Sequence, residues 1–415
     1  MQHRYPCGGV NRRRFLAASA ASTASIPLIS GAPASAPPQA SSPVGKTTHQ
    51  GGDGKPPSRL AVPGLYPGRV VEVMNPRMIR NGTKDREAIK ASMDLGIKTL
   101  TGATDAVEGW KHFFEPGDVV GIKVVPNGHP HAHSSYEIVL EVIDKLLACG
   151  VKAREIFVYD RYRGEFLQAG YQKILPDGVR WGGMDPEGNQ FKLDFPSHRS
   201  DPLVGFDRDA FVWMDLIPYG DDPKDDSKYR SHLGKLVTKT LNKIVAIPVM
   251  KDHGSAGVTG ALKNMSHGTV NNVARSHSNS FTNVCNQFIP QMVTHPIIRE
   301  KFVLQIMDGI RAVFQGGPFG PDVKWTWENN AILFATDPVA LDHVEWDRVD
   351  AQRVKNNLPP VAASGKAAID PLKKEGFDVR QPQHIALAGA LGLGLFDYKS
   401  NKGRRHSIDH KVVRI

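Results

Sequence analysis

The chain has 415 residues, 40% of them hydrophobic, and its 52 lysines and arginines outnumber its 42 aspartates and glutamates to give a formal net charge of +10. This length can bury one large core or two modest ones, and the lack of a long apolar run argues against a stable membrane span in the mature chain. A modest basic excess without a long basic and aromatic run argues against nucleic acid as a partner and favours small anionic ligands.

The N-terminus has the pattern of an export signal. Residues 12–16, Arg-Arg-Arg-Phe-Leu, precede an apolar stretch rich in Ala and Ser that ends near Ser30 in small residues. Paired arginines before Phe-Leu are typical of the twin-arginine type, whose export machinery carries folded proteins. We predict cleavage after Ala34, since cleavage after Ala36 would place Pro37 at the scissile bond. The mature chain (48 basic and 42 acidic residues, net charge +6) would then be periplasmic; the alternative is a disordered basic tail.

Residues 35–67 are rich in Pro, Ser, Gly and Ala, and we expect a disordered linker because such a segment buries too little apolar surface to fold. The folded domain is then expected over residues 68–415, starting with a strand at Arg69–Met74. Apolar spacing and turn residues predict the next elements: a helix from near Asn81, a helix over Asp105–Phe114 and a strand over Val119–Val125.

A strand–helix–strand unit is the strongest indication of the fold. After the strand at Val119–Val125, Ser134 and Glu137 open a helix with the spacing of a capping box, and Gly150 ends it. Glu155–Asp160 follows as a strand, as a parallel right-handed crossover requires. We therefore predict an α/β fold with a mostly parallel or mixed sheet, flanked by helices in Rossmann-like layers.

The rest of the chain continues this pattern around an insertion. Between about residues 171 and 230, short strand-like pieces among many Gly, Pro and Asp residues predict an embedded β-rich insertion. The apolar run Ile244–Met250 predicts a fully buried strand. The later elements are predicted as a helix over Ser278–Val293, strands over Phe302–Met307 and Asn330–Ala335, a helix that starts at Asp337, and closing strands over His384–Ala388 and Lys411–Ile415.

The polar residues that follow the buried strand form the main candidate site. Lys251, His253, Lys263, Asn264 and His267 supply two permanent cations, two titratable imidazoles and an amide within 17 residues. An unpaired buried lysine costs too much free energy to serve packing alone, which favours a ligand site over a structural role. Lys263 and Asn264 also stand at a predicted helix start, where free backbone N–H groups and two cations would form a pocket for phosphate or carboxylate.

Further polar residues stand at or just after the ends of other predicted strands. Because the carboxyl ends of neighbouring strands in an open α/β sheet meet at one crevice, we expect Lys123, Asn127 and Asp308 to contribute to substrate binding. Asp308 or Asp160 would orient a histidine of the site. For Asp337, which precedes Pro and a helical pattern, a helix cap is the favoured role.

His129, His131 and His133 suggest a metal site. In an extended segment alternate side chains face one way, and Pro130 favours such a backbone, so three imidazoles could share a face and bind zinc, nickel or copper. The alternative is that these histidines belong to a surface loop. Weaker candidate ligands are His277 and His295.

The cysteines limit the cofactors that the chain can bind. Cys7, Cys149 and Cys285 are scattered, and Cys7 belongs to the predicted signal. Without a Cys-x-x-Cys pair, neither an iron–sulfur cluster nor a zinc site made of thiolates is expected. A disulfide between Cys149 and Cys285 remains open, because spacing alone cannot decide it.

Six segments form a specific pattern only when they are taken together: Phe114–Val124, Ile156–Asp160, Ile247–His253, Gly257–Asn264, Asp308–Gly309 and Thr336–Asp342. With them the chain resembles the family called domain of unknown function 362, from about residue 69 to the C-terminus. Some members of that family carry ferredoxin-type cluster domains, from which this chain departs because it lacks their cysteines. The central domain is also distantly similar to the nickel-pincer lactate racemase family, in which lysine and histidine hold the cofactor.

Two hypotheses for the function follow. In the first, the protein is an enzyme acting on a small anionic substrate, which Lys251 and Lys263 hold while His253 or His267 acts as general acid–base or metal ligand. A divalent metal is then a candidate cofactor. In the alternative, the protein is a periplasmic metal- or anion-binding carrier with the same pocket and no turnover.

Overall fold

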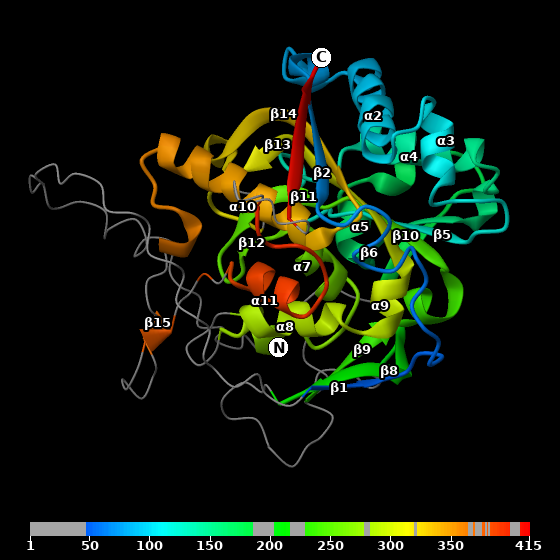
Figure 1. The fold of residues 1–415 in the computed structure, drawn as a ribbon, viewed down its shortest axis with the longest axis vertical. Helices are drawn as coiled ribbons and strands as arrows, with labels where there is room; N and C mark the ends of the chain where they lie inside the picture. The colour runs from blue at the N-terminus through cyan, green and yellow to red at the C-terminus, as the bar shows by residue number, and fades with distance from the viewer. Residues whose placement is uncertain are drawn as a thin grey trace, which may run out of the picture. The chain divides into compact units, whose positions relative to one another are not determined.

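The computed structural model describes residues 47–185, 203–215, 229–277, 283–318, 322–363, 368–369, 376–377, 380, 382–398 and 407–415. Within them, one sheet contains ten strands, drawn as arrows in Figure 1. These are β2 (Arg69–Met74), β5 (Val120–Lys123), β6 (Ile156–Tyr162), β7 (Arg180–Asp185), β10 (Lys243–Ala246), β11 (Val249–His253), β12 (Gly257–Val258), β13 (Phe302–Val313), β14 (Thr326–Ala335) and β17 (Asp409–Arg414). The main order is β17–β2–β14–β13–β10–β5–β6–β7, and β11 pairs with β12 and β13.

One half of this sheet is parallel. Strands β13, β10, β5, β6 and β7 pair in parallel with one another, whereas β14 is antiparallel to both β13 and β2. Helix α4 (Tyr136–Ala148) connects β5 to β6, so the predicted strand–helix–strand unit is present. The fold is α/β with a large, mostly parallel sheet flanked by helices, as predicted.

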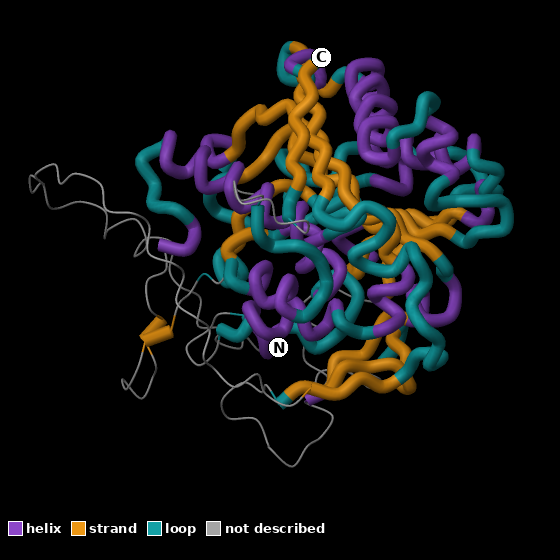
Figure 2. The backbone as a smooth tube through the Cα atoms, in the orientation of Figure 1, coloured by secondary structure: helices purple, strands orange, loops and turns teal. Residues whose placement is uncertain are grey.

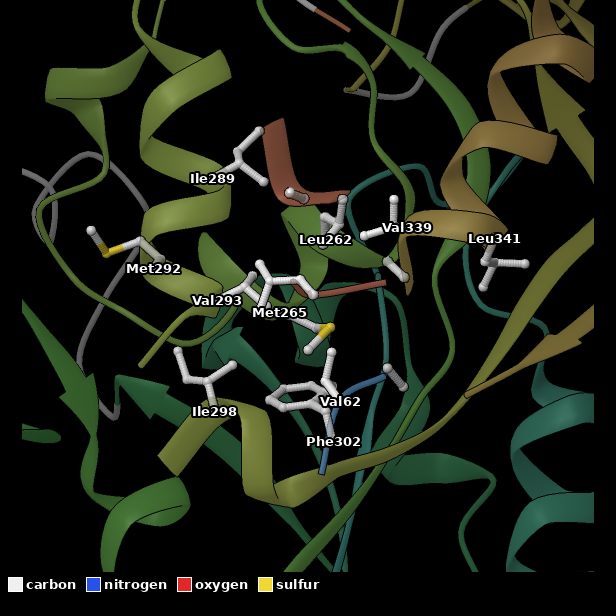
Figure 3. Packing of buried hydrophobic residues seen from close by; sticks show 14 of the residues in the cluster. Val62, Leu262, Met265, Ile289, Met292, Val293, Ile298, Phe302, Val339 and Leu341 are labelled. Atoms are coloured by element: carbon white, nitrogen blue, oxygen red, sulfur yellow. The ribbon is translucent and has the colours of Figure 1, made fainter. Parts of the chain in front are cut away.

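Alternate residues of the central strands face two separate apolar layers. In β10, Ile244 belongs to one layer and Val245 to the other. The layer around Val245 is completed by α2 (Arg86–Thr101), α3 (Ala106–Lys111), α4 and α5 (Arg163–Gln168), and the layer around Ile244 by α7 (Gly260–Ser266), α8 (Cys285–Val293), α10 (Pro338–Lys355) and α11 (His384–Ala390) (Figures 1 and 2). Figure 3 shows the second layer, which includes Leu262 of α7 and Ile289 of α8.

The predicted strand Ile244–Met250 is two strands, β10 and β11, which break at Pro248. Proline has no backbone N–H to donate to a sheet, so the ladder cannot run through this position. The Pro248 carbonyl instead accepts a hydrogen bond of 2.7 Å from the Asp308 backbone N–H. As a result β11 continues beside β13 beyond the end of β10 and carries Lys251 and His253 with it.

Other elements differ from those predicted. His384–Ala388, predicted as a strand, lies in α11, because Ala and Leu favour a helix and this segment packs on α8 and α10. Asp308 lies inside β13 and not at its end. The predicted capping box at Ser134 is absent, since Ser135 is the N-cap and its side chain makes no cap hydrogen bond. Residues 278–282 of the predicted helix lie outside the described residues.

The folded part begins earlier than predicted. Of the predicted linker, residues 35–46 lie outside the described residues, but Thr47–Gln50 forms β1 and Ala61 and Val62 are buried. Strand β1 pairs antiparallel with β8 (Phe206–Met214), which pairs with β9 (Arg230–Gly234) in a sheet of three strands. This polar segment buries little apolar surface by itself, and it is ordered because it pairs with β8, a strand far away in the sequence.

The remaining short elements are β3 (Ile79–Arg80), β4 (Thr83–Lys84), β15 (Ala368–Ile369), β16 (Gly376–Phe377) and α9 (Pro296–Lys301). Cys149 and Cys285 are both free, and they lie in different apolar layers, so they do not form the disulfide that spacing left open. In the part of the chain that the structure describes, no helix has both the length and the apolar character needed to cross a bilayer.

Candidate functional site

Polar groups from the ends of β5, β6 and β11 come together as the strand-end argument predicts. The Lys123 ammonium donates hydrogen bonds to the Asp160 carboxylate (2.6 Å) and to the Val124 carbonyl (2.8 Å), and both charged side chains are buried. The Asp160 charge also acts on Lys251, which follows β10 in the chain. The Lys123 charge is therefore neutralised by the Asp160 carboxylate at the border of the site. Lys251 has no such ion pair among the described residues.

Lys251 is buried, with 1% of its surface exposed. Its ammonium donates to the Asn127 side-chain oxygen (2.5 Å) and to the Pro318 carbonyl (3.2 Å), and no carboxylate among the described residues lies within ion-pair distance. Burial lowers the pKa of Lys251 to about 7, and the nearby charge of Lys263 contributes in the same direction. An amine with this pKa can give or take a proton near neutral pH.

Glu165 is a candidate site residue that the sequence reasoning missed. It lies on α5, just after β6, and its carboxyl group makes no hydrogen bond or ion pair among the residues that the structure describes. Burial raises its pKa to about 7, helped by the charge of Asp160, while Lys251 and Lys123 act in the opposite direction. Extending the strand-end rule from Asp160 to the short helix behind it would have included Glu165.

The start of helix α7, predicted as an anion pocket, is filled by a carboxyl group of the protein itself. The backbone N–H groups of Ala261 and Leu262 donate to the two oxygens of Asp342 at 2.6 and 2.8 Å. Gly260 has a φ of +56°, and a Cβ at this position would overlap with the Asp342 carboxyl group. Burial raises the pKa of Asp342 to about 8, although both N–H groups oppose this shift. The prediction of a ligand at this helix start is therefore wrong.

The charge of Lys263 acts on three neutral imidazoles. Its ammonium nitrogen lies 3.4 Å from His277 Nε2, and the His277 ring centre lies 4.8 Å from that of His267 and 5.7 Å from that of His253. Burial, followed by the charge of Lys263, lowers the pKa of His253 and His267 well below the ordinary value and that of His277 to about 3. The positive charge in this group therefore belongs to Lys263.

The three histidines differ in their hydrogen bonds. His267 Nδ1 lies 3.0 Å from the Ser266 hydroxyl, and its Nε2 lies 2.9 Å from the Ser276 hydroxyl, so both ring nitrogens are engaged. This arrangement fits a structural role and not the general acid–base role predicted for His267. His253 differs, because its Nδ1 accepts hydrogen bonds from the backbone N–H groups of Ser255 and Ala256, each at 3.0 Å.

Asn264 offers a further donor near Lys123. A Cβ added at Gly268 would lie 2.9 Å from Lys123 Cε and 3.0 Å from Asn264 Oδ1, which places the two side chains around one glycine. Asn264 is 5% exposed, and its side-chain nitrogen has no hydrogen-bond partner among the described residues. A buried amide N–H without a partner is costly and fits a ligand oxygen.

Asp308 has a different role from the one predicted. Its carboxylate accepts hydrogen bonds from the Ser135 backbone N–H (2.7 Å), the Ser135 hydroxyl (2.5 Å) and the Ile310 backbone N–H (3.0 Å). Asp308 therefore anchors the start of α4 to β13 and does not orient a histidine. Asp337 caps α10 through Val339 and Ala340, as predicted.

The predicted metal site is not assembled. The backbone N–H groups of His131 and Ala132 both donate to the Gly128 carbonyl (3.0 and 2.8 Å), so the segment is a turn and not the extended chain that would align His129 and His133 with His131. The described residues contain no group of three His, Cys, Asp or Glu side chains that could hold a metal ion. His295 Nδ1 accepts from the backbone N–H of Ile297 at the start of α9.

The candidate site lies in the part of the chain that matches the sequence profile of a known family. The sequence profile of the family described as "Domain of unknown function (DUF362)" matches residues 120–347, more than half of the chain. No curated protein matches the chain. Similar solved structures include the lactate racemase apoprotein from Thermoanaerobacterium thermosaccharolyticum (11% identity, TM-score 0.33, covering 68% of this chain and 56% of that one). A protein from Thermotoga maritima is similar to the same degree (11%, 0.34, 68% and 61%), so the chain covers less than two thirds of either structure.

Proposed function

The chain belongs to the DUF362 family, and from this starting point we propose that it is an enzyme that acts on a small anionic substrate bound between Lys251 and Lys263. One observation carries the proposal. Lys251 is buried, its ammonium contacts only neutral oxygens among the described residues, and the charge of Lys263 acts on it. Charging Lys251 in a low-dielectric region is costly while the charge of Lys263 acts on it, and a bound anion would remove that cost.

The donor groups among the candidate site residues favour an anion over a cation. The Asn264 amide nitrogen and the Lys251 and Lys263 ammonium groups are all hydrogen-bond donors. Carboxylates and phosphates, which present several acceptor oxygens, match such a set. We therefore propose a small carboxylate or phosphate as the substrate class, with Lys263 and Asn264 holding it.

Lys251 and Glu165 would supply the chemistry. The pKa of each lies near 7, because burial lowers that of the amine and raises that of the acid. Such groups can exchange a proton with a bound substrate near neutral pH, and acid–base catalysis of this kind contributes roughly 10²- to 10⁴-fold to a rate. We propose proton transfer to or from the substrate as the reaction class.

Binding is tested by calorimetric titration with oxalate and with inorganic phosphate, with chloride as the control salt. We expect Lys263→Met to weaken binding by about 10- to 100-fold, because a charge-assisted contact is worth roughly 1.5–3 kcal/mol. Lys111→Met is the matched control, since Lys111 is half-exposed and its ion pair among the described residues is with Glu108 on the same helix. Equal affinities for the parent and Lys263→Met would contradict the proposal.

Turnover separates the enzyme from the predicted alternative of a carrier. The protein is incubated in D₂O with small carboxylates that have a hydrogen on the carbon next to the carboxyl group, and deuterium incorporation is followed by NMR. An enzyme catalyses exchange that Lys251→Met abolishes, whereas a carrier binds the same anions without exchange. The metal-carrier version has less support, because His129, His131 and His133 do not form a site.

We also propose that the chain is exported to the periplasm by the twin-arginine route. The support is the sequence around Arg13 and Arg14, which lies outside the described residues. In a bacterial expression host, we expect periplasmic protein whose N-terminus is Ser35 by mass spectrometry, and Arg13→Lys with Arg14→Lys should keep it in the cytoplasm. Arg4→Lys is the control. Periplasmic protein that persists in the double variant would contradict this route.

A further inference from the structure

The turn after β11 fixes which nitrogen of His253 carries the proton. Strands β11 and β12 form a hairpin in which Asp252 pairs with Val258 and His253 with Gly257. Inside its turn, the backbone N–H groups of Ser255 and Ala256 both point at His253 Nδ1, each at 3.0 Å. A backbone N–H can only donate, so Nδ1 must be the acceptor and cannot carry a hydrogen.

The proton of the neutral ring is therefore on Nε2. This nitrogen has no hydrogen-bond partner among the residues that the structure describes. The positive charges of Lys263 and Lys251 both act on the ring and, together with burial, hold its pKa well below the ordinary value. The ring stays neutral in the physiological range, and it presents one N–H group in a region where the charges of Lys263 and Lys251 act.

We propose that His253 is a fixed hydrogen-bond donor whose Nε2–H binds an oxygen atom of the anion held by Lys251 and Lys263. This inference rests on the proposed function and deepens it, because it names the atom of His253 that contacts the substrate. It also changes the predicted role of His253. A general base needs a free lone pair, and both lone-pair positions of this ring are taken: Nδ1 by two N–H groups and Nε2 by its own proton.

The same tautomer does not fit a metal ligand. A neutral histidine that binds a metal through one nitrogen donates the N–H of the other nitrogen to an acceptor. In His253 the other nitrogen accepts two N–H groups, so binding a metal through Nε2 would require loss of the single N–H proton of the neutral ring, which would leave an imidazolate anion. The nickel-type cofactor implied by the distant resemblance, in which a histidine holds the metal, therefore does not fit His253.

The first test reads the tautomer without any ligand. Protein labelled with ¹⁵N at histidine is studied by long-range ¹H–¹⁵N correlation NMR between pH 5.5 and 8.5, with His253→Asn used to assign the signal. We expect an unprotonated Nδ1 and a protonated Nε2 throughout this range. A protonated Nδ1, or a ring that titrates near pH 6.5, would overturn the inference whatever the result of anion binding.

The second test uses two substitutions that separate the two nitrogens. In His253→Asn the side-chain oxygen can still accept from Ser255 and Ala256, as in an Asx turn, but the distal donor is lost. In His253→Gln the side-chain amide reaches the Nε2 position and can donate there. We expect His253→Asn to keep the parent melting temperature and to weaken oxalate binding about 10- to 100-fold. His253→Gln should recover part of that loss.

The outcomes distinguish this inference from the proposed function. If the parent binds oxalate and phosphate and His253→Asn binds them equally well, the donor role of His253 is wrong while the anion site stands. If the parent binds neither anion, both proposals fail together. If nickel or zinc binds the parent stoichiometrically and His253→Asn abolishes that binding, His253 is a metal ligand and the inference is overturned.

Discussion

Replacing Lys251 by methionine is expected to remove a pH dependence of stability that we predict for the parent protein between about pH 7 and pH 9.5. In the parent, burial lowers the pKa of Lys251 from 10.5 to about 7. Between pH 7 and pH 10.5, Lys251 is protonated in the unfolded chain and increasingly unprotonated in the folded chain. Because the unfolded state binds more protons there, the free energy of unfolding rises with pH.

The size of this effect follows from the same shift. The free-energy cost of burying the charged Lys251 side chain applies in full below about pH 7 and disappears above about pH 10.5. Each pKa unit of the shift corresponds to about 1.4 kcal/mol. From pH 7 to pH 9.5 the parent should therefore gain roughly 3 kcal/mol relative to Lys251→Met. Urea unfolding followed by tryptophan fluorescence measures both proteins across this range.

The control for this experiment is Lys111→Met, which removes a half-exposed lysine on α3 and should follow the parent at every pH. The same slope in the parent and in Lys251→Met would mean that Lys251 keeps an ordinary pKa in the folded protein. The chemical part of the proposed function would then lose its support, since a permanently charged lysine cannot accept a proton.

Gly260→Ala is expected to destabilise the protein by about 3 kcal/mol or more. Gly260 has a φ of +56°, in the left-handed region, and this costs a residue with a side chain roughly 1–2 kcal/mol. The added Cβ would also overlap with the carboxyl group of Asp342, which accepts the first N–H groups of α7. The substitution must therefore displace either the helix that carries Lys263 or its cap.

Gly82→Ala is the matched control for this substitution. Gly82 has a φ of +78°, and a Cβ at this position meets no atom within 4 Å, so only the backbone cost of about 1–2 kcal/mol is expected. The difference between the two variants in urea unfolding isolates the contact with Asp342. Equal losses of stability would show that the Asp342 carboxyl group does not occupy the start of α7.

The sequence was sufficient to predict the parts of the site that depend on the sheet. Polar residues at or just after the ends of predicted strands, at Lys123, Asp160 and Lys251, do converge, because parallel strands end at the same edge. The layers on both faces follow from a second local rule: side chains alternate along a strand, so Ile244 and Val245 face two different cores. Both features can be predicted from the local pattern of residues within a single segment.

The parts that could not be predicted depend on contacts between distant segments. Asp342 lies about eighty positions after the helix start that it caps, and no local pattern marks such a pair. His129, His131 and His133 have the spacing of an extended segment, but hydrogen bonds to Gly128 turn the chain there. The roles of His253 and His267 differ only through which groups each ring nitrogen contacts, and residue type alone does not contain that information.

Titration of the parent protein with oxalate at pH 8, by calorimetry in two buffers of different ionisation enthalpy, tests the central claim most directly. An anion beside Lys251 favours its charged form, so binding should be accompanied by the uptake of close to one proton, and Lys251→Met should lose that uptake. Absence of binding, or binding without proton uptake in the parent, would contradict an anion site built around a neutral buried lysine.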